Sequence, residues 1–215
     1  MARFEVPDGW VVQAYKYALN PTPAQQRSLC SHAGAARFAR NHMLGLVKAT
    51  LDQRAAERTY GIAEDDLTPS LGWSLPALRR AWNLRKTAVA PWWAQNSKEA
   101  YNTGLDSLAR SLEAWSKSRT GRRAGACAGF PRFHSKRDRA SVRFTTGTIG
   151  VEADRHHVTL PRLGTIHAHE STRKLARRIE AGTAHVLSAT VTRDSTSPSP
   201  RPSWPTAARR WPGSR

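Results

Sequence analysis

The chain has 215 residues, of which 39% are hydrophobic, so it can bury one sizeable core or two small ones. Its 34 Lys and Arg residues outnumber 16 Asp and Glu residues, and the net charge of +18 favours polyanionic partners. No apolar run approaches the length of a bilayer span or of a signal-peptide core. Cys30 and Cys127 are too few for a disulfide framework or a four-cysteine zinc site. We therefore expect a cytoplasmic protein with no membrane partner.

The first predicted elements are a strand and two helices. Residues 10–19 alternate apolar and polar side chains, as a half-buried strand does. Two prolines then end the strand, and Thr22, followed three residues later by Gln25, forms a capping box that starts a helix over residues 23–32. Gly34 predicts a boundary, because the apolar residues after it recur at the three- and four-residue spacings of a second helix.

The middle of the chain is predicted to be mostly helical. Residues 52–69 are polar and poorly periodic, which indicates a loop or a frayed helix. A helix is predicted over residues 76–86, and the longest one over residues 97–115, where one apolar stripe recurs. The stripe consists of Tyr101, Leu105, Leu108, Leu112 and Trp115. Trp92 and Trp93 could stack on bases, but aromatic residues next to a proline at a helix entrance more often belong to a core.

The most basic stretch lies between residues 117 and 143, where nine Lys or Arg residues accompany a single acid, Asp138. Its centre, GFPRFHSKR at residues 129–137, places cations between aromatic rings. Lys and Arg attract phosphates without regard to base sequence, while Phe130 and Phe133 could stack on unpaired bases or anchor the loop to a core. The segment predicts a nucleic-acid contact, and the alternative is a solvated loop pinned by its apolar residues.

After the basic stretch the pattern changes to short strands interrupted by Gly and Pro, which favours a small barrel or sheet. The predicted strands are at residues 141–145, 147–151, 157–160, 165–169 and 185–192. His156, His157, His167 and His169 lie among them, but no cysteine or spaced carboxylate completes a metal site. We expect these histidines to lie on the surface or to face phosphates.

Four segments of the chain combine these features in a characteristic order and spacing. The segments are AYKYALNPT (residues 14–22), GAARFARN (34–41), GFPRFHSKR (129–137) and VTLPRLG (158–164). Together they resemble the N-terminal half of TnpB, the OrfB-type transposase family of insertion sequences, whose members are similar to type V CRISPR nucleases. The resemblance covers roughly Trp10 to Arg193. Each segment alone is of modest specificity, but four in the right order are hard to produce by accident.

The resemblance implies an α+β fold in which a helical recognition domain is inserted into a small wedge-like β-barrel. The barrel would comprise residues 1–20 and 129–193, and the helical domain residues 21–128 with a helix-turn-helix-like start at 22–50. An αα-hairpin is an equally common interpretation of that start. Residues 194–215, rich in Ser, Pro, Arg and Trp, predict a disordered tail or the product of a frameshift. Without a final strand, the preceding barrel strand would keep an unpaired edge.

The resemblance also implies partners, namely DNA and a transposon-derived guide RNA. In similar proteins the full chain is an RNA-guided DNA endonuclease, and these domains hold the guide and read a short motif beside the target. The DNA that carries this motif is double-stranded and is called the motif duplex below. By position, Lys98, Asn102, Thr145 and Thr146 match family residues that face the motif duplex. Lys98 and Asn102 could equally be the polar face of an amphipathic helix. The residues expected to bind nucleic acid are Tyr15, Lys16, Arg37, Lys98, Asn102, Arg122, Arg123, Arg132, Lys136, Arg137, Arg143, Thr145 and Thr146.

The catalytic half of the family would begin soon after Arg193. That half is expected to bind Mg2+ through three carboxylates and zinc through CxxC pairs, whereas Asp194 is the last acidic residue here and no CxxC occurs. We therefore expect no catalytic residue, metal site or cofactor among these residues, and a truncated transposon protein that binds nucleic acid without cutting it. One alternative is an active endonuclease component whose nuclease half is supplied elsewhere. Another is a basic RNA-binding structural protein.

Overall fold

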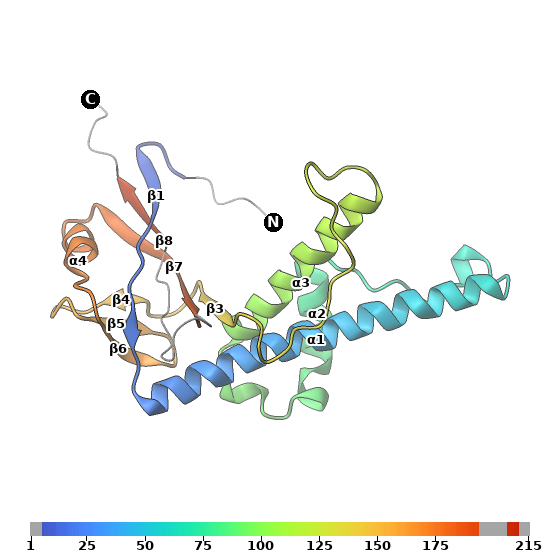
Figure 1. Ribbon diagram of the computed structural model, residues 1–215, viewed down its shortest axis with the longest axis horizontal. Helices are drawn as coiled ribbons and strands as arrows, with labels where there is room; N and C mark the ends of the chain where they lie inside the picture. The colour runs from blue at the N-terminus through green and yellow to red at the C-terminus, as the bar shows by residue number, and fades with distance from the viewer. Residues whose placement is uncertain (1–5, 194–205, 211–215) are drawn as a thin grey trace. The chain divides into compact units, whose positions relative to one another are not determined.

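The computed structural model describes residues 6–193 and the backbone of residues 206–210 (Figure 1). The elements in chain order are β1 (Trp10–Ala14), β2 (Leu19–Asn20), α1 (Pro23–Thr59), the 3₁₀ helix η1 (Glu64–Asp66), α2 (Leu75–Val89), the 3₁₀ helix η2 (Trp93–Gln95), α3 (Lys98–Arg119), β3 (Ser141–Phe144), β4 (Gly150–Val151), β5 (His157–Leu160), β6 (Gly164–Ala168), α4 (Arg173–Glu180), β7 (Ala184–Thr192) and β8 (Thr206–Arg210). This mixture of helices and strands confirms the predicted α+β class. None of the described helices combines the length and apolarity that crossing a bilayer requires.

The chain divides into two compact units. The sheet unit comprises Met1–Ala33 and Arg139–Arg215, and the helical unit comprises Gly34–Asp138. The sheet unit contains two antiparallel four-stranded sheets, with the strand orders β1-β8-β7-β3 and β2-β6-β5-β4. Its buried side chains include Phe144, Leu160, Ile166 and Leu175.

The described strands form these two sheets, in agreement with the predicted small sheets, and the wedge-like barrel implied by the resemblance is not confirmed among them. The strand predicted over residues 10–19 is interrupted after Ala14, and its two parts, β1 and β2, pair with different sheets. Between them Tyr17 is only 7% exposed, so this connection is held by burial in the core. Val11 and Val12 of β1 are exposed, so the predicted half-buried pattern is also wrong there.

Strand β8 lies within the segment predicted to be a disordered tail or the product of a frameshift. Residues 206–210 pair with β1 on one side and with β7 on the other. The edge of β7, which was expected to be unpaired without a final strand, therefore has a partner, and the interpretation of the tail as a whole stays a prediction. The rest of the predicted tail, residues 194–205 and 211–215, lies outside the described residues. The frameshift hypothesis concerns the segment that starts at Asp194, most of which lies outside the described residues.

Helix α1 replaces the two short helices predicted on either side of Gly34. Its start is the predicted capping box: the Thr22 N–H donates to Gln25 Oε1 at 3.0 Å, and the Gln25 N–H donates to Thr22 Oγ1 at 3.3 Å. The helix then continues through Gly34 to Thr59, into residues predicted to be a loop or a frayed helix. Gly34 lies between alanines, the best helix formers, and needs no left-handed backbone, so nothing ends the helix there.

In the helical unit, α2 and α3 confirm the two helices predicted over residues 76–86 and 97–115. Ser74 and Ser97 cap them, each accepting a hydrogen bond from a first-turn N–H. Of the predicted stripe, Tyr101, Leu105, Leu108 and Leu112 are buried. Trp92 packs edge-on against Phe38, with ring centroids 5.3 Å apart, which supports the core interpretation of this tryptophan.

The backbones of α1 and α3 touch at Gly104, and this closeness gives a prediction. A Cβ added to Gly104 would lie 2.0 Å from the Ala36 carbonyl oxygen. Gly104→Ala should therefore lower the free energy of unfolding by at least the roughly 1–3 kcal/mol of an overpacked core. Gly45→Ala is the matched control, because a Cβ at Gly45 meets nothing within 4 Å, and it should stabilise α1 by about 1 kcal/mol. Urea unfolding measures both, and a neutral Gly104→Ala would contradict the close packing.

The buried His32 predicts a loss of stability at acidic pH. It is 1% exposed, and its Nδ1–H donates to the Ser28 carbonyl at 2.8 Å. Burial lowers its pKa, the charge of Arg162 lowers it further, and the Ser28 bond opposes them. In the unfolded chain the His32 imidazole takes up a proton near its ordinary pKa of about 6.5, whereas in the folded chain it stays neutral to lower pH. The free energy of unfolding should therefore fall as the pH drops below about 6.5.

Thermal unfolding from about pH 7.5 down to about pH 5.5 tests this linkage, with the fall in the midpoint compared between the wild type and His32→Gln. The variant should show a smaller fall, because it has no imidazole to charge. His42 and His134 also have lowered pKa values and should leave part of the dependence in place. If the thermal midpoint falls equally in the wild type and in His32→Gln, His32 does not cause the loss of stability at acidic pH.

Candidate nucleic-acid interface

The segment Gly129–Arg137, called the basic loop, exposes a row of side chains in the helical unit. Arg132, Phe133, Lys136 and Arg137 are all exposed, and Phe133 retains 56% of its accessible surface. Three cations beside an accessible aromatic ring are the groups that bind phosphates and stack on bases. The predicted contact segment is therefore available at the surface.

The basic loop is fixed to α1 by Arg40 and Asn41, which we call the clamp. Arg40 Nη1 donates to the Arg132 carbonyl at 3.0 Å. Asn41 Nδ2 donates to the His134 carbonyl at 2.8 Å, and its Oδ1 accepts from the His134 N–H at 2.9 Å. The backbone on both sides of Phe133 is thus held by three hydrogen bonds.

The contacts of Arg40 and Asn41 with the basic loop were not predicted from the sequence. Arg40 and Asn41 end the second segment of the family resemblance, but only Arg37 of that helix was named as a candidate. A signal existed, because Arg40 falls on the apolar side of its helix, where it is 4% exposed. A buried arginine needs a partner, and a polar residue beside it is a natural second contact. Burial lowers the pKa of Arg40, and Asp138 opposes this shift.

The two phenylalanines of the basic loop have different surroundings. Phe130 packs edge-on against Trp115, with ring centroids 4.9 Å apart, so it anchors the loop to α3. Phe133 is exposed and belongs to no ring pair among the described residues. The anchoring alternative therefore applies to Phe130, and stacking of Phe133 on a base stays a prediction.

His134 contributes backbone contacts rather than charge. Burial lowers its pKa, the charges of Arg40 and Arg37 lower it further, and Asp138 opposes them. The imidazole is therefore neutral at neutral pH, because its ordinary pKa of about 6.5 is already below 7. The positive charge of the basic loop comes from Arg132, Lys136 and Arg137.

The remaining candidates of the helical unit lie at separate places. Arg122 and Arg123 are exposed in the turn after α3, where their Nε atoms donate to Thr120 Oγ1 at 3.0 Å and to the Ala126 carbonyl at 2.8 Å. Lys98 is exposed in the first turn of α3, and Asn102 is half-buried one turn later. Arg37 is half-buried on α1.

The other candidates belong to the sheet unit. Tyr15 stacks on Tyr17, with centroids 6.4 Å apart, and its hydroxyl contacts Arg178. Lys16 is exposed, and Arg143 donates to Ser188 Oγ at 3.2 Å. Thr145 and Thr146 are exposed just after β3. Because Lys98 and Asn102 lie in the helical unit, the grouping of these four residues around one duplex stays a prediction.

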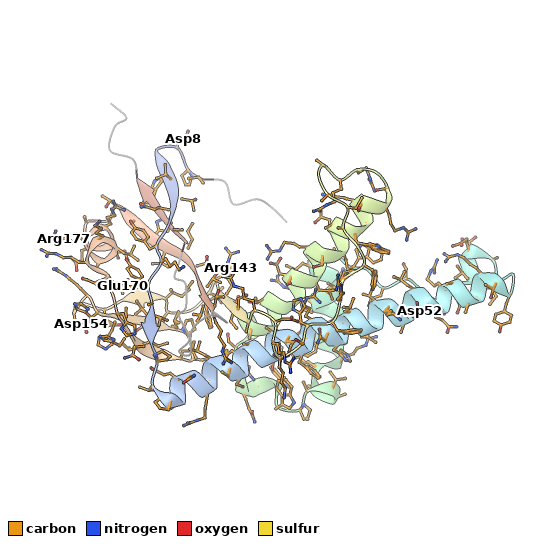
Figure 2. All side chains as sticks on the ribbon, in the orientation of Figure 1. Asp8, Asp52, Arg143, Asp154, Glu170 and Arg177 are labelled. Carbon is orange, nitrogen blue, oxygen red and sulfur yellow. The ribbon has the colours of Figure 1, made fainter. Side chains whose placement is uncertain are left out.

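Helix α4 carries a basic surface that was not predicted from the sequence. Leu175 and Ala176 are buried, while Arg173, Lys174 and Arg177 are exposed. Figure 2 shows Arg177 at the outer margin of the sheet unit. The signal was the pair of apolar residues within a charged run, which is too short to show a helical period reliably.

The four histidines gather on the second sheet. The His167 ring lies 5.2 Å from that of His157, 6.1 Å from that of His169 and 6.4 Å from that of His156. His157 Nδ1 is bonded to the Asp154 carboxylate, which Figure 2 labels. Within the described part of the chain, no group of three or more His, Cys, Asp or Glu side chains is placed to hold a metal ion.

A family model of helix-turn-helix domains of OrfB type from IS605 elements matches residues 11–55. In this structure those residues form β1, β2 and most of α1.

Two proteins of Mycobacterium tuberculosis are 43% identical to the chain over 204 residues. They are "Putative RNA-guided DNA endonuclease MT2953" of strain CDC 1551 / Oshkosh and "Putative RNA-guided DNA endonuclease Rv2885c" of strain ATCC 25618 / H37Rv. The match covers 91% of this chain and 42% of each relative. These matches confirm the resemblance of the chain to the N-terminal half of the TnpB/OrfB-type insertion-sequence transposase family.

Proposed function

We propose that these 215 residues bind DNA and a transposon-derived guide RNA as the N-terminal part of a TnpB/OrfB-type protein. The observation that supports this most directly is the basic loop, which exposes three cations and whose backbone the clamp holds at Arg132 and His134. A net charge of +18 supplies the long-range attraction for the same partners. The names of the two relatives, which describe RNA-guided DNA endonucleases, make RNA and DNA together the favoured pair.

The proposal includes a division of work between the two parts of the chain. In this proposal the wedge-like domain comprises residues 1–20 and 129–193, and the helical recognition domain comprises residues 21–128, as the resemblance implies. Lys98 and Asn102, with Thr145 and Thr146, would read the motif duplex, because an amide can pair with an adenine edge and a threonine hydroxyl can reach phosphates or base edges. The cations of the basic loop would hold the backbone. The two exposed free cysteines suit the reducing cytoplasm.

We infer that these residues alone bind without cutting. Phosphodiester cleavage in this family needs a set of metal-binding carboxylates, and the described residues bring no such group together. A plasmid cleavage assay with Mg2+ and co-purified RNA separates this from the enzymatic alternative. Cleavage that EDTA abolishes would overturn the binding-only proposal. A basic structural protein would instead show no preference for transposon-end RNA.

The salt dependence of binding tests the role of the basic loop. On duplex DNA the logarithm of affinity should fall with the logarithm of salt by about 0.9 per phosphate neutralised. Replacing Arg132, Lys136 and Arg137 together by Ala should flatten this slope by about two or three units, and should weaken all sequences about equally. Fluorescence anisotropy at several salt concentrations measures both quantities.

The matched control replaces Arg79, Arg80 and Arg85 by Ala. These exposed cations lie on α2, so the change in net charge is the same while the basic loop is intact. The control should leave the slope nearly unchanged. If both triple variants flatten the slope equally, binding depends on the overall charge of the protein and not on the basic loop. If the loop variant has the wild-type slope, the basic loop does not contact phosphates and has a structural role.

Asn102 and Thr146 should instead affect the choice between duplex sequences. Asn102→Ala or Thr146→Ala should alter the ratio of affinities for different motif duplexes more than the mean affinity, because an amide or a hydroxyl placed at base edges discriminates by about 1–3 kcal/mol per pair. Competition binding with a library of short duplexes measures this ratio. Equal losses on every sequence would show that the positions inferred from the resemblance do not read the motif.

A further inference from the structure

Phe133 is the exposed aromatic residue of the basic loop. Its ring is 56% exposed, although burial of such a ring is normally favourable. The anchoring task in this loop belongs to Phe130, which packs against Trp115. Within the described part of the chain, no aromatic pair or cation–π contact includes Phe133.

The exposed ring is also held in position. The clamp binds the carbonyl of the residue before Phe133 and both backbone groups of the residue after it. The main chain that carries the ring therefore loses little conformational freedom when a ligand binds. An exposed aromatic ring on a fixed backbone is preorganised for a flat partner.

We propose that Phe133 is a stacking platform for one unpaired nucleobase, and that Arg132 and Lys136 bind the phosphates beside that nucleotide. This rests on the proposed function and names the part of the nucleic acid that the basic loop contacts. Every base has a π-face, so stacking on Phe133 tolerates any sequence, whereas in an intact duplex both faces of each base are covered by neighbours. The ligand is therefore a single-stranded segment.

Charge complementarity favours a nucleotide over a protein partner. Arg132, Lys136 and Arg137 are exposed in the same short loop, and Asp138 is the only acid nearby in the sequence. An apolar side chain of a partner protein could cover the Phe133 ring, but it would leave these cations without counter-charges. Phosphates on either side of a stacked base satisfy both needs at once.

The test measures binding of the full 215-residue chain to two probes. One is a single-stranded RNA of mixed sequence that carries 2-aminopurine, whose fluorescence reports stacking, and the other is relaxed, covalently closed plasmid DNA, which offers no strand ends. The variants are Phe133→Ala, Phe133→Leu and Phe133→Trp. Tyr60→Ala is the matched control, because Tyr60 is an 85% exposed aromatic residue of the same unit outside the loop.

Phe133→Ala should weaken binding of the single strand by roughly 5- to 150-fold, which corresponds to the loss of one stacked base. It should also abolish the change in 2-aminopurine fluorescence, while plasmid binding and its salt slope stay as in the wild type. Phe133→Trp should retain single-strand binding, Phe133→Leu should lose most of it, and Tyr60→Ala should change nothing. An unchanged thermal midpoint of Phe133→Ala checks that the loop is intact.

Three results would overturn the inference. If Phe133→Ala binds the single strand with wild-type affinity, Phe133 is not a stacking platform, and the proposed function is unaffected. Equal losses on both probes would make Phe133 a structural part of the loop, and wild-type behaviour of Phe133→Leu would indicate a general apolar contact. If the wild-type chain binds neither probe, the proposed function fails and the inference fails with it.

Discussion

The candidate interface depends on the contact between Asn41 and the backbone of His134. This side-chain amide donates to the carbonyl and accepts from the N–H of the same residue, across a sequence separation of 93 positions. It imitates the pairing of a strand and fixes both the position and the orientation of the basic loop. Arg40 adds a third bond from its buried guanidinium. A buried charge is costly without partners, so the loop and α1 stabilise each other.

A neutral His134 is part of the same arrangement. Arg40 and Arg37 lie close enough to lower its pKa, so protonation would add a third positive charge to a partly buried cluster. At neutral pH the imidazole is uncharged and the clamp does not have to overcome this repulsion. The cations that remain in the basic loop point to solvent. The buried charge of Arg40 and the exposed charges of the basic loop are therefore separated within a few residues.

The net charge and the clamp contribute different properties. A charge of +18 attracts any polyanion over the distance that salt screening allows, and it carries no information about where or how the polyanion sits. In the proposed function, the basic loop with its fixed backbone determines where the polyanion binds. In the sheet unit, α4 presents another group of cations on a short helix docked by Leu175 and Ala176. There too, apolar burial positions the charges that face solvent.

The sequence alone determined the elements whose signals are local. The capping box of Thr22 and Gln25, the apolar stripe of α3 and the strands of the C-terminal region follow from side chains a few residues apart, and the family resemblance follows from four short segments. Tertiary contacts decided what lies between these elements. Gly34 lies inside one continuous helix, residues 10–19 divide between two sheets, and β8 pairs with β7, because each outcome depends on partners distant in the sequence. The clamp and the close approach at Gly104 have the same origin, since neither a buried arginine nor a helical glycine reveals from sequence which backbone it will meet.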